Sequence, residues 1–261
     1  MNRLNTLFSK KNKDILSIFF TAGYPELNST VPILESLEKG GIDMVEIGIP
    51  FSDPMADGPV IQSSSSKALK NGMTVRILLN QVKEAREKVK EMPFVLMGYL
   101  NPVLKYGIEN FFKDSKEAGV DALIIPDLPF DDYMSEFKNL SSKYDLPVIM
   151  LITPETSEER IHLIDDHCDG FIYMVSSAST TGTKDRYNES QLEYFHKINR
   201  MNLKHQRLIG FGISNPETFT QASYNASGAI IGSHFIKCLD KAGGNPQKAV
   251  EDLLISIGKT H

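Results

Sequence analysis

Short apolar segments rich in β-branched and aromatic residues alternate with longer amphipathic segments along this chain, and the alternation repeats eight times. The apolar segments predict strands at residues 15–22, 44–49, 94–97, 122–125, 148–152, 171–175, 208–211 and 229–231. Parallel pairing is expected, because each helix carries the chain back to the start of the next strand. Eight such units in 261 residues predict a closed (β/α)8 TIM barrel, with an open doubly wound sheet as the alternative. Thr21-Ala-Gly-Tyr-Pro25 stands at the end of the first strand, where a dinucleotide-binding sheet would carry a glycine-rich loop, and this disfavours the open sheet.

The spacing of the units also predicts the domain organisation. No segment of linker-like composition separates them, so we expect residues 1–261 to form one TIM-barrel domain. Leu4, Leu7 and Phe8 recur at helical spacing, which predicts an extra N-terminal helix covering one end of the barrel. Ser214-x-x-Glu217 predicts a capping box for the helix after the seventh strand.

The charge balance limits the partners of the chain. Its 28 Lys and Arg against 33 Asp and Glu give a net charge of −5, so we expect no attraction to nucleic acid or to an anionic membrane. Cys168 and Cys238 lie far apart without metal-ligand spacing, and no His-x-x-x-His pair occurs, so we expect neither a disulfide scaffold nor a metal site. The chain lacks a signal-peptide pattern and a bilayer-spanning apolar run, which makes the cytoplasm the expected location.

A single carboxylate, Glu46, interrupts the apolar second strand. Alternate residues of a strand share a face, so Glu46 points the same way as Met44. Val45 and Ile47 point the opposite way, toward a covering helix. An acid inside a barrel must be paired, neutral or chemically active. The alternative to a catalytic role is an interior acid neutralised by a neighbour.

Two further acids, Asp53 and Asp57, lie on the loop that follows this strand. The loop is restricted by Pro50, Pro54 and Pro59, which limit the positions that its carboxylates can take. Asp57 alone could be a loop-shaping residue, but active sites of barrels lie at the carboxyl ends of strands, beside Glu46. Glu46 and Asp57, two acids with different surroundings, therefore predict an acid–base pair.

Glycine-rich turns after the seventh and eighth strands predict an anion site. Gly210 and Gly212 allow the backbone to approach a ligand closely, and Gly232-Ser233 lies at the N-terminus of a predicted helix. Free N–H groups at a helix N-terminus bind phosphate without Lys or Arg, and barrels use this position for phosphate. The alternative is a pair of structural glycine turns.

Residues 176–188 form an unusually long polar loop after the sixth strand. Long loops on the active face of a barrel often act as lids, although an idle loop is the alternative. Tyr173, inside the sixth strand, could face a ligand or fill the barrel, and packing is favoured for an isolated Tyr.

The stretch Pro50-Phe-Ser-Asp-Pro-Met-Ala-Asp-Gly-Pro59 closely resembles a segment of the tryptophan synthase alpha subunit family. The resemblance covers nearly the whole chain. It also includes Thr21-Ala-Gly-Tyr-Pro25, Met97-Gly-Tyr-Leu-Asn-Pro102, Pro126-Asp-Leu-Pro129, Gly210-Phe-Gly-Ile-Ser214 and Gly228-Ala-Ile-Ile-Gly-Ser233. The family implies a TIM-barrel lyase of tryptophan biosynthesis that cleaves indole-3-glycerol phosphate to indole and glyceraldehyde 3-phosphate.

The resemblance implies roles for individual residues. Glu46 matches the general acid–base residue, and Asp57 matches the residue that accepts the indole N–H. The substrate-binding residues would be Phe19, Tyr173, Thr181, Gly182, Phe211, Gly212, Gly232 and Ser233. The family usually reads Gly-Val-Thr-Gly and then a basic residue at the lid, whereas this chain reads Ser179-Thr-Thr-Gly182 followed by Thr183.

The resemblance also implies a partner. No cofactor is expected in this chain, because pyridoxal phosphate would be bound by a beta subunit in an alpha2beta2 tetramer. The residues expected to face that subunit are Asp53, Pro54, Asn101 and Pro102.

Two other functions compete with this interpretation. An isomerase or decarboxylating synthase acting on phosphoribosyl-anthranilate derivatives would need a Lys or Cys at a strand end, and no predicted strand end carries one. A non-catalytic partner of a larger enzyme would not need both carboxylates and the phosphate turn.

Overall fold

Eight parallel strands close into a barrel in the computed structural model, which describes residues 2–176 and 186–259. The strands are β1 (Ile15–Thr21), β2 (Met44–Gly48), β3 (Phe94–Met97), β4 (Ala122–Ile124), β5 (Val148–Ile152), β6 (Phe171–Val175), β7 (Gln206–Gly210) and β8 (Gly228–Ile231). Neighbours in sequence pair with each other, and β1 also pairs with β8, with Ile18 opposite Ile231. The TIM-barrel prediction is confirmed, and the strand bounds agree with the sequence to within two residues.

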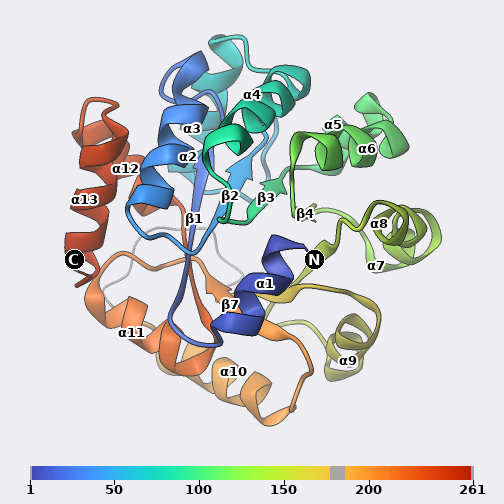
Figure 1. Cartoon of the computed structure of the whole chain (residues 1–261). Coiled ribbons are helices and arrows are strands. Elements are labelled where there is room, and N and C mark those ends of the chain that lie inside the picture. The colour runs from blue at the N-terminus through green and yellow to red at the C-terminus, as the bar shows by residue number, and fades with distance from the viewer. Residues whose placement is uncertain (1, 177–185, 260–261) are drawn as a thin grey trace.

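Helices surround the barrel (Figure 1). Before β5 they are α1 (Arg3–Lys10), η1 (Leu27–Ser29), α2 (Thr30–Lys39), α3 (Pro59–Lys70), α4 (Val75–Lys88), α5 (Leu100–Tyr106), α6 (Ile108–Ala118), α7 (Phe130–Asp132), η2 (Tyr133–Phe137) and α8 (Lys138–Tyr144). After β5 they are α9 (Glu158–His167), α10 (Glu189–Arg200), α11 (Pro216–Asn225), α12 (Ser233–Lys241) and α13 (Pro246–Ser256). None of the helices in the described parts of the chain is long and apolar enough to cross a membrane.

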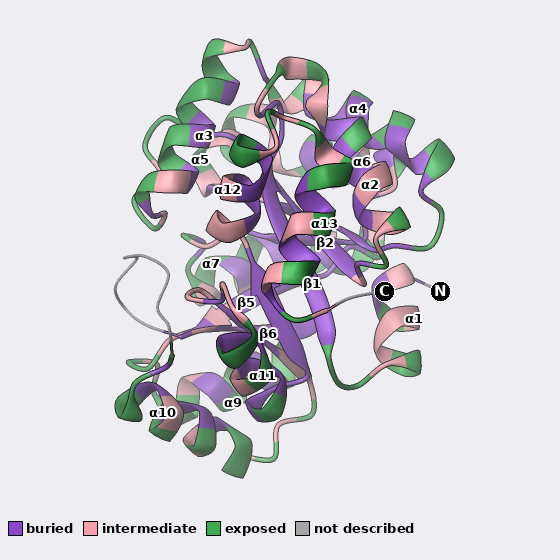
Figure 2. Ribbon diagram, turned by 90° about the vertical axis from the view of Figure 1, so that its left-hand side faces the viewer, coloured by how far each residue is buried: buried purple, intermediate pink, exposed green. Residues whose placement is uncertain are grey.

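The strands separate two apolar layers. On β2, Met44 packs with residues inside the barrel, whereas Val45 and Ile47 pack with residues between the barrel and the helices. The strand residues are mostly buried and none is exposed, so the exposed residues belong to the helices and loops (Figure 2). This alternation places Glu46 inside the barrel, as the sequence predicted.

Helix α1 closes the end of the barrel opposite the strand carboxyl ends, in front of the strands in Figure 1. Leu4 is fully buried in the same apolar cluster as Ile15 and Phe171, and the Phe8 ring lies 5.8 Å from the Phe171 ring. Arg3 is also paired with the buried Asp121 at 3.1 Å. The extra N-terminal helix is therefore a floor for the barrel interior.

Two local predictions differ from the structure. The cap of α11 is Asn215, not Ser214: the Asn215 side chain accepts a hydrogen bond from the Thr218 N–H at 2.9 Å, and Pro216 occupies the first turn, where its missing N–H needs no partner. Helix α5 was not predicted. Pro102 obscured it in the sequence, although a proline in the first turn is compatible with a helix.

Candidate active site

Glu46 is fully buried on β2, inside the barrel. The Ser17 hydroxyl donates a hydrogen bond to Glu46 Oε1 at 3.0 Å, and Oε2 has no partner among residues 2–176 and 186–259. Burial raises the pKa of Glu46 to about 8, against the opposing effect of the Ser17 hydrogen bond. Glu46 is therefore a neutral acid at pH 7, and Oε2 is the oxygen that the described residues leave without a hydrogen bond.

Asp57 lies half-buried on the loop between β2 and α3. The loop turns tightly, since the Asp57 N–H donates to the Pro54 carbonyl at 3.1 Å, and Gln62 Nε2 donates to the Asp57 carbonyl at 2.8 Å. Burial raises the pKa of Asp57 to about 6, and a hydrogen bond from Tyr99 opposes that rise. Asp57 is consequently ionised at pH 7, whereas Glu46 is not.

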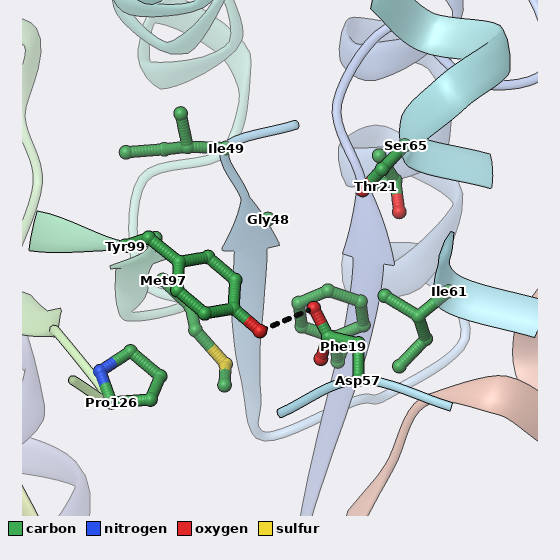
Figure 3. A pocket seen from close by; sticks show the side chains of 11 residues that line it. Phe19, Thr21, Gly48, Ile49, Asp57, Ile61, Ser65, Met97, Tyr99 and Pro126 are labelled. Atoms are coloured by element: carbon green, nitrogen blue, oxygen red, sulfur yellow. Dashed lines mark hydrogen bonds between the residues drawn. The ribbon is translucent and has the colours of Figure 1, made fainter. Parts of the chain in front are cut away.

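Tyr99, at the start of α5, holds the Asp57 carboxylate, a role that sequence reasoning missed. Its hydroxyl donates to Asp57 Oδ2 at 3.1 Å (Figure 3) and accepts the Ala56 N–H at 3.0 Å. Its ring stacks on Phe51, with centroids 5.1 Å apart. The sequence placed it after the third strand and within the Met97–Pro102 motif. These signals show that it lies on the active face but not what it contacts.

A pocket of about 290 Å³, partly open to solvent, lies at the carboxyl ends of β1, β2 and β3. Its lining residues are Phe19, Thr21, Gly48, Ile49, Asp57, Ile61, Ser65, Met97, Gly98, Tyr99 and Pro126. The Phe19 ring lies over Gly48, where a Cβ would come within 2.6 Å of it, so the absence of a side chain makes room for the ring. Figure 3 shows Phe19 beside the Asp57 carboxylate. Of the predicted site residues, the pocket thus brings together Phe19 and Asp57.

Glu46 and the glycine turns do not line this pocket, but they adjoin its wall. Phe19 is the register partner of Glu46 across β1 and β2. A Cβ built on Gly232 would lie 3.3 Å from Phe19 Cδ1 and 3.7 Å from Ile61 Cδ1. Phe19 therefore contacts the Gly232 turn and shares a register position with the buried acid, while its ring forms part of the Asp57 pocket.

The turn after β8 has the predicted form. Gly232 is the N-cap of α12, and Ser233 is its first residue, so the first N–H groups of the helix lie at the carboxyl end of the barrel. On the neighbouring turn after β7, Phe211 and Gly212 have φ values of +71° and +80°. Both turns can present backbone N–H groups to an anion.

Tyr173 is buried inside the barrel with Phe211 packed edge-on against it, the centroids 6.3 Å apart. A Cβ on Gly210 would collide with the Tyr173 hydroxyl, so this glycine makes space for the phenol. The pKa of Tyr173 is raised well above its usual value, first by burial and then by the charges of Glu46 and Asp57. Tyr173 thus stays neutral at pH 7.

The predicted partner-facing residues lie on two adjacent segments. Asp53 and Pro54 belong to the loop that carries Asp57, and Asn101 and Pro102 belong to the first turn of α5. The Tyr99 contacts with Phe51, Ala56 and Asp57 join these segments. On the same segments, Met55 and Leu104 are exposed apolar residues, at 87% and 50%.

Thr181, Gly182 and most of the predicted lid lie outside the described residues. Asp127 accepts the Leu100 N–H at 2.8 Å and so supports the start of α5. Within the described ranges, no group of three or more His, Cys, Asp or Glu side chains could hold a metal ion.

Comparisons with known proteins agree on one family. A family model described as "Tryptophan synthase alpha chain" matches residues 6–261. The chain is 57% identical to the tryptophan synthase alpha chain of Phocaeicola vulgatus, over 98% of this chain and 99% of the relative. Tryptophan synthase subunit alpha from Legionella pneumophila superposes with a TM-score of 0.88 at 35% identity, covering 98% of this chain and 97% of that one. A chain of tryptophan synthase from M. tuberculosis gives a TM-score of 0.85 at 27% identity, covering 100% of both chains.

Proposed function

This chain belongs to the tryptophan synthase alpha chain family, and we propose on that premise that Glu46 and Asp57 are its catalytic residues. The chain is the lyase subunit that cleaves indole-3-glycerol phosphate in tryptophan biosynthesis. The observation that supports the proposal is the difference between the two acids. Burial leaves Glu46 protonated at pH 7, while the more open Asp57 is ionised.

These protonation states suit a retro-aldol cleavage. Glu46 donates its proton to C3 of the indole, which gives the ring a positive charge. The ionised Asp57 accepts the indole N–H and stabilises that charge. The Glu46 carboxylate then takes the proton from the hydroxyl next to the ring as the carbon–carbon bond breaks. The hydroxyl proton has in effect moved to C3, and Glu46 is restored.

The remaining substrate contacts are assigned by position. Phe19 and Tyr173 would lie against the indole ring, with Phe211 beside Tyr173. Gly212, Gly232 and Ser233 would hold the phosphate through backbone N–H groups. Thr181 and Gly182 are assigned by the family resemblance alone.

The family implies a beta-chain partner. We place that partner on the loop carrying Asp53 and Pro54 and on α5 with Asn101 and Pro102, because exposed Met55 and Leu104 supply apolar surface there. The beta chain would carry pyridoxal phosphate in an alpha2beta2 tetramer.

We further propose a cytoplasmic location and one barrel domain over residues 1–261.

Substitution of the two acids tests the mechanism. Glu46→Gln and Asp57→Asn should each lower indole release by about 10²- to 10⁴-fold, because each removes a charge or proton and keeps the side-chain shape. Binding of an indole-3-alkyl phosphate without hydroxyl groups should persist. The chain contains no Trp, so indole fluorescence reports this binding directly.

Glu109→Gln is the matched control, because Glu109 is a surface residue paired with Lys143. It should turn over as the unsubstituted protein does. Turnover within threefold of that level for Glu46→Gln would refute the assignment of the general acid.

A further inference from the structure

The carbonyl of Phe211 accepts hydrogen bonds from two side-chain hydroxyls. Ser176 Oγ donates at 3.0 Å from the end of β6, and Tyr187 Oη donates at 3.3 Å from the segment before α10. These two donors approach the same oxygen from different parts of the chain. The orientation of this one peptide group is thus set by side chains rather than by the strand ladder.

That peptide group also carries the N–H of Gly212. The Phe211–Gly212 bond is trans, so the carbonyl and the N–H point in opposite directions. No acceptor for the Gly212 N–H occurs in the described ranges. Holding the Phe211 carbonyl therefore aims the Gly212 N–H to the other side, and hydrogen bonds to a carbonyl strengthen the donor on the same amide.

The backbone at this turn needs such support. Phe211 is a non-glycine residue in the left-handed region, at φ +71°, followed by Gly212 at φ +80°. A left-handed conformation is unfavourable for a bulky residue unless its surroundings hold it.

Tyr187 is itself held firmly in place. Its exposure is 3%, its N–H donates to Gln221 Oε1 at 3.3 Å, and its ring packs edge-on against Phe195 with centroids 5.1 Å apart. Its Cε1 atom lies 3.7 Å from the position of a Cβ on Gly212. The phenol therefore packs under the Gly212 turn, and its hydroxyl has little freedom to leave the Phe211 carbonyl.

We propose that Tyr187 is a positioning residue for the phosphate end of the substrate, acting through the Phe211–Gly212 peptide. This rests on the proposed function, which assigns the Gly212 N–H to the phosphate. Tyr187 touches no reacting atom and belongs to none of the motifs that identify the family. Its loss should weaken phosphate binding and leave the indole end of the site unchanged.

Tyr187→Phe tests the proposal, because it removes the hydroxyl and keeps the ring packing. In the reverse condensation of indole with glyceraldehyde 3-phosphate, we expect the KM for glyceraldehyde 3-phosphate to rise about three- to tenfold, the effect of one lost hydrogen bond. The KM for indole and kcat should stay within twofold. Ser176→Ala, which removes the other donor, should change the same constant in the same direction.

Tyr194→Phe is the matched control. Tyr194 is also buried, and its ring packs against the same Phe195 with centroids 5.7 Å apart. Its hydroxyl has no hydrogen-bond partner among the described residues. It should alter neither KM. If Tyr187→Phe behaves as Tyr194→Phe does, or raises both KM values equally, the positioning role is wrong.

A calorimetric titration with sn-glycerol 3-phosphate separates this proposal from the proposed function. We expect Tyr187→Phe to weaken binding about three- to tenfold relative to Tyr194→Phe. Unsubstituted protein that forms no indole would overturn the proposed function, whereas equal affinities in an active enzyme would overturn only the role of Tyr187.

Discussion

Burial gives the two acids of the site opposite protonation states, and for Glu46 this has an energetic consequence. The pKa of Glu46 rises from an ordinary 4.5 to about 8, chiefly because the charged form would be removed from water. Between these values the unfolded chain releases the proton and the folded chain keeps it. The contribution of protonated Glu46 to the free energy of unfolding is therefore fully present below about pH 4.5 and is lost as the pH rises through 8.

Glu46→Gln should therefore stabilise the folded protein at high pH, although it should lower indole release. The free energy of unfolding of this variant, minus that of the unsubstituted protein, should grow from pH 5 to pH 9 by about 2–5 kcal/mol. Urea unfolding at pH 5, 7 and 9 measures it. A difference that does not change with pH would mean that Glu46 is ionised inside the barrel.

At the scale of elements, the Asp57 site is built by two loops. The loop after β2 supplies the carboxylate, and the turn from β3 into α5 supplies the Tyr99 hydroxyl that holds it. Asp127, after β4, in turn supports the start of α5 through the Leu100 N–H. Three successive strand ends thus determine where one carboxylate lies, which links the proposed partner-facing surface to the chemistry.

Tyr99→Phe should move the acid limb of the pH profile of kcat/KM to higher pH. The Tyr99 hydrogen bond lowers the pKa of Asp57, so its loss raises that pKa above about 6, by about half to one pH unit. Ionised Asp57 then becomes scarcer at pH 7, and indole release there should fall by up to about twofold.

Tyr106→Phe is the control for this experiment. The Tyr106 hydroxyl donates to Asp114 at 2.6 Å within the α5–α6 pair, which lines no part of the pocket. It should leave the profile in place. An identical profile for Tyr99→Phe would show that the hydrogen bond does not tune Asp57.

At the scale of the whole molecule, the apolar residues that close one end of the barrel lie opposite the proposed active site at the other end. Helix α1 fills one end with Leu4 and Phe8, and the acids and glycine turns occupy the other. The pairing of β1 with β8 joins the first and last strands. Apolar packing at the floor can thus support the barrel without touching the site.

Leu4→Ala should lower the free energy of unfolding by about 2–5 kcal/mol, because it leaves a cavity in the barrel floor. KM and kcat should change by less than twofold. Unfolding should remain one transition, coincident by near- and far-UV circular dichroism, as expected for one domain. Leu163→Ala, at a position 37% exposed, is the control and should change the stability by less than about 1 kcal/mol. A Leu4 effect no larger than the control would show that α1 is not part of the core.

The sequence by itself determined the barrel, the inward direction of Glu46 and the turn into α12. These follow from local rules: alternation along a strand, the spacing of strand and helix, and glycine at a helix start. The Asn215 cap and α5 were missed because a neighbouring Ser and a Pro gave competing local signals.

Only the tertiary structure decided which residues hold the site together. Tyr99 and Asp57 lie 42 positions apart, and Phe211 lies 35 positions after Ser176 and 24 after Tyr187. Nothing local marks these pairs. Closure of the barrel brings the strand ends to one face, and only there do hydroxyl and acceptor come within hydrogen-bonding distance.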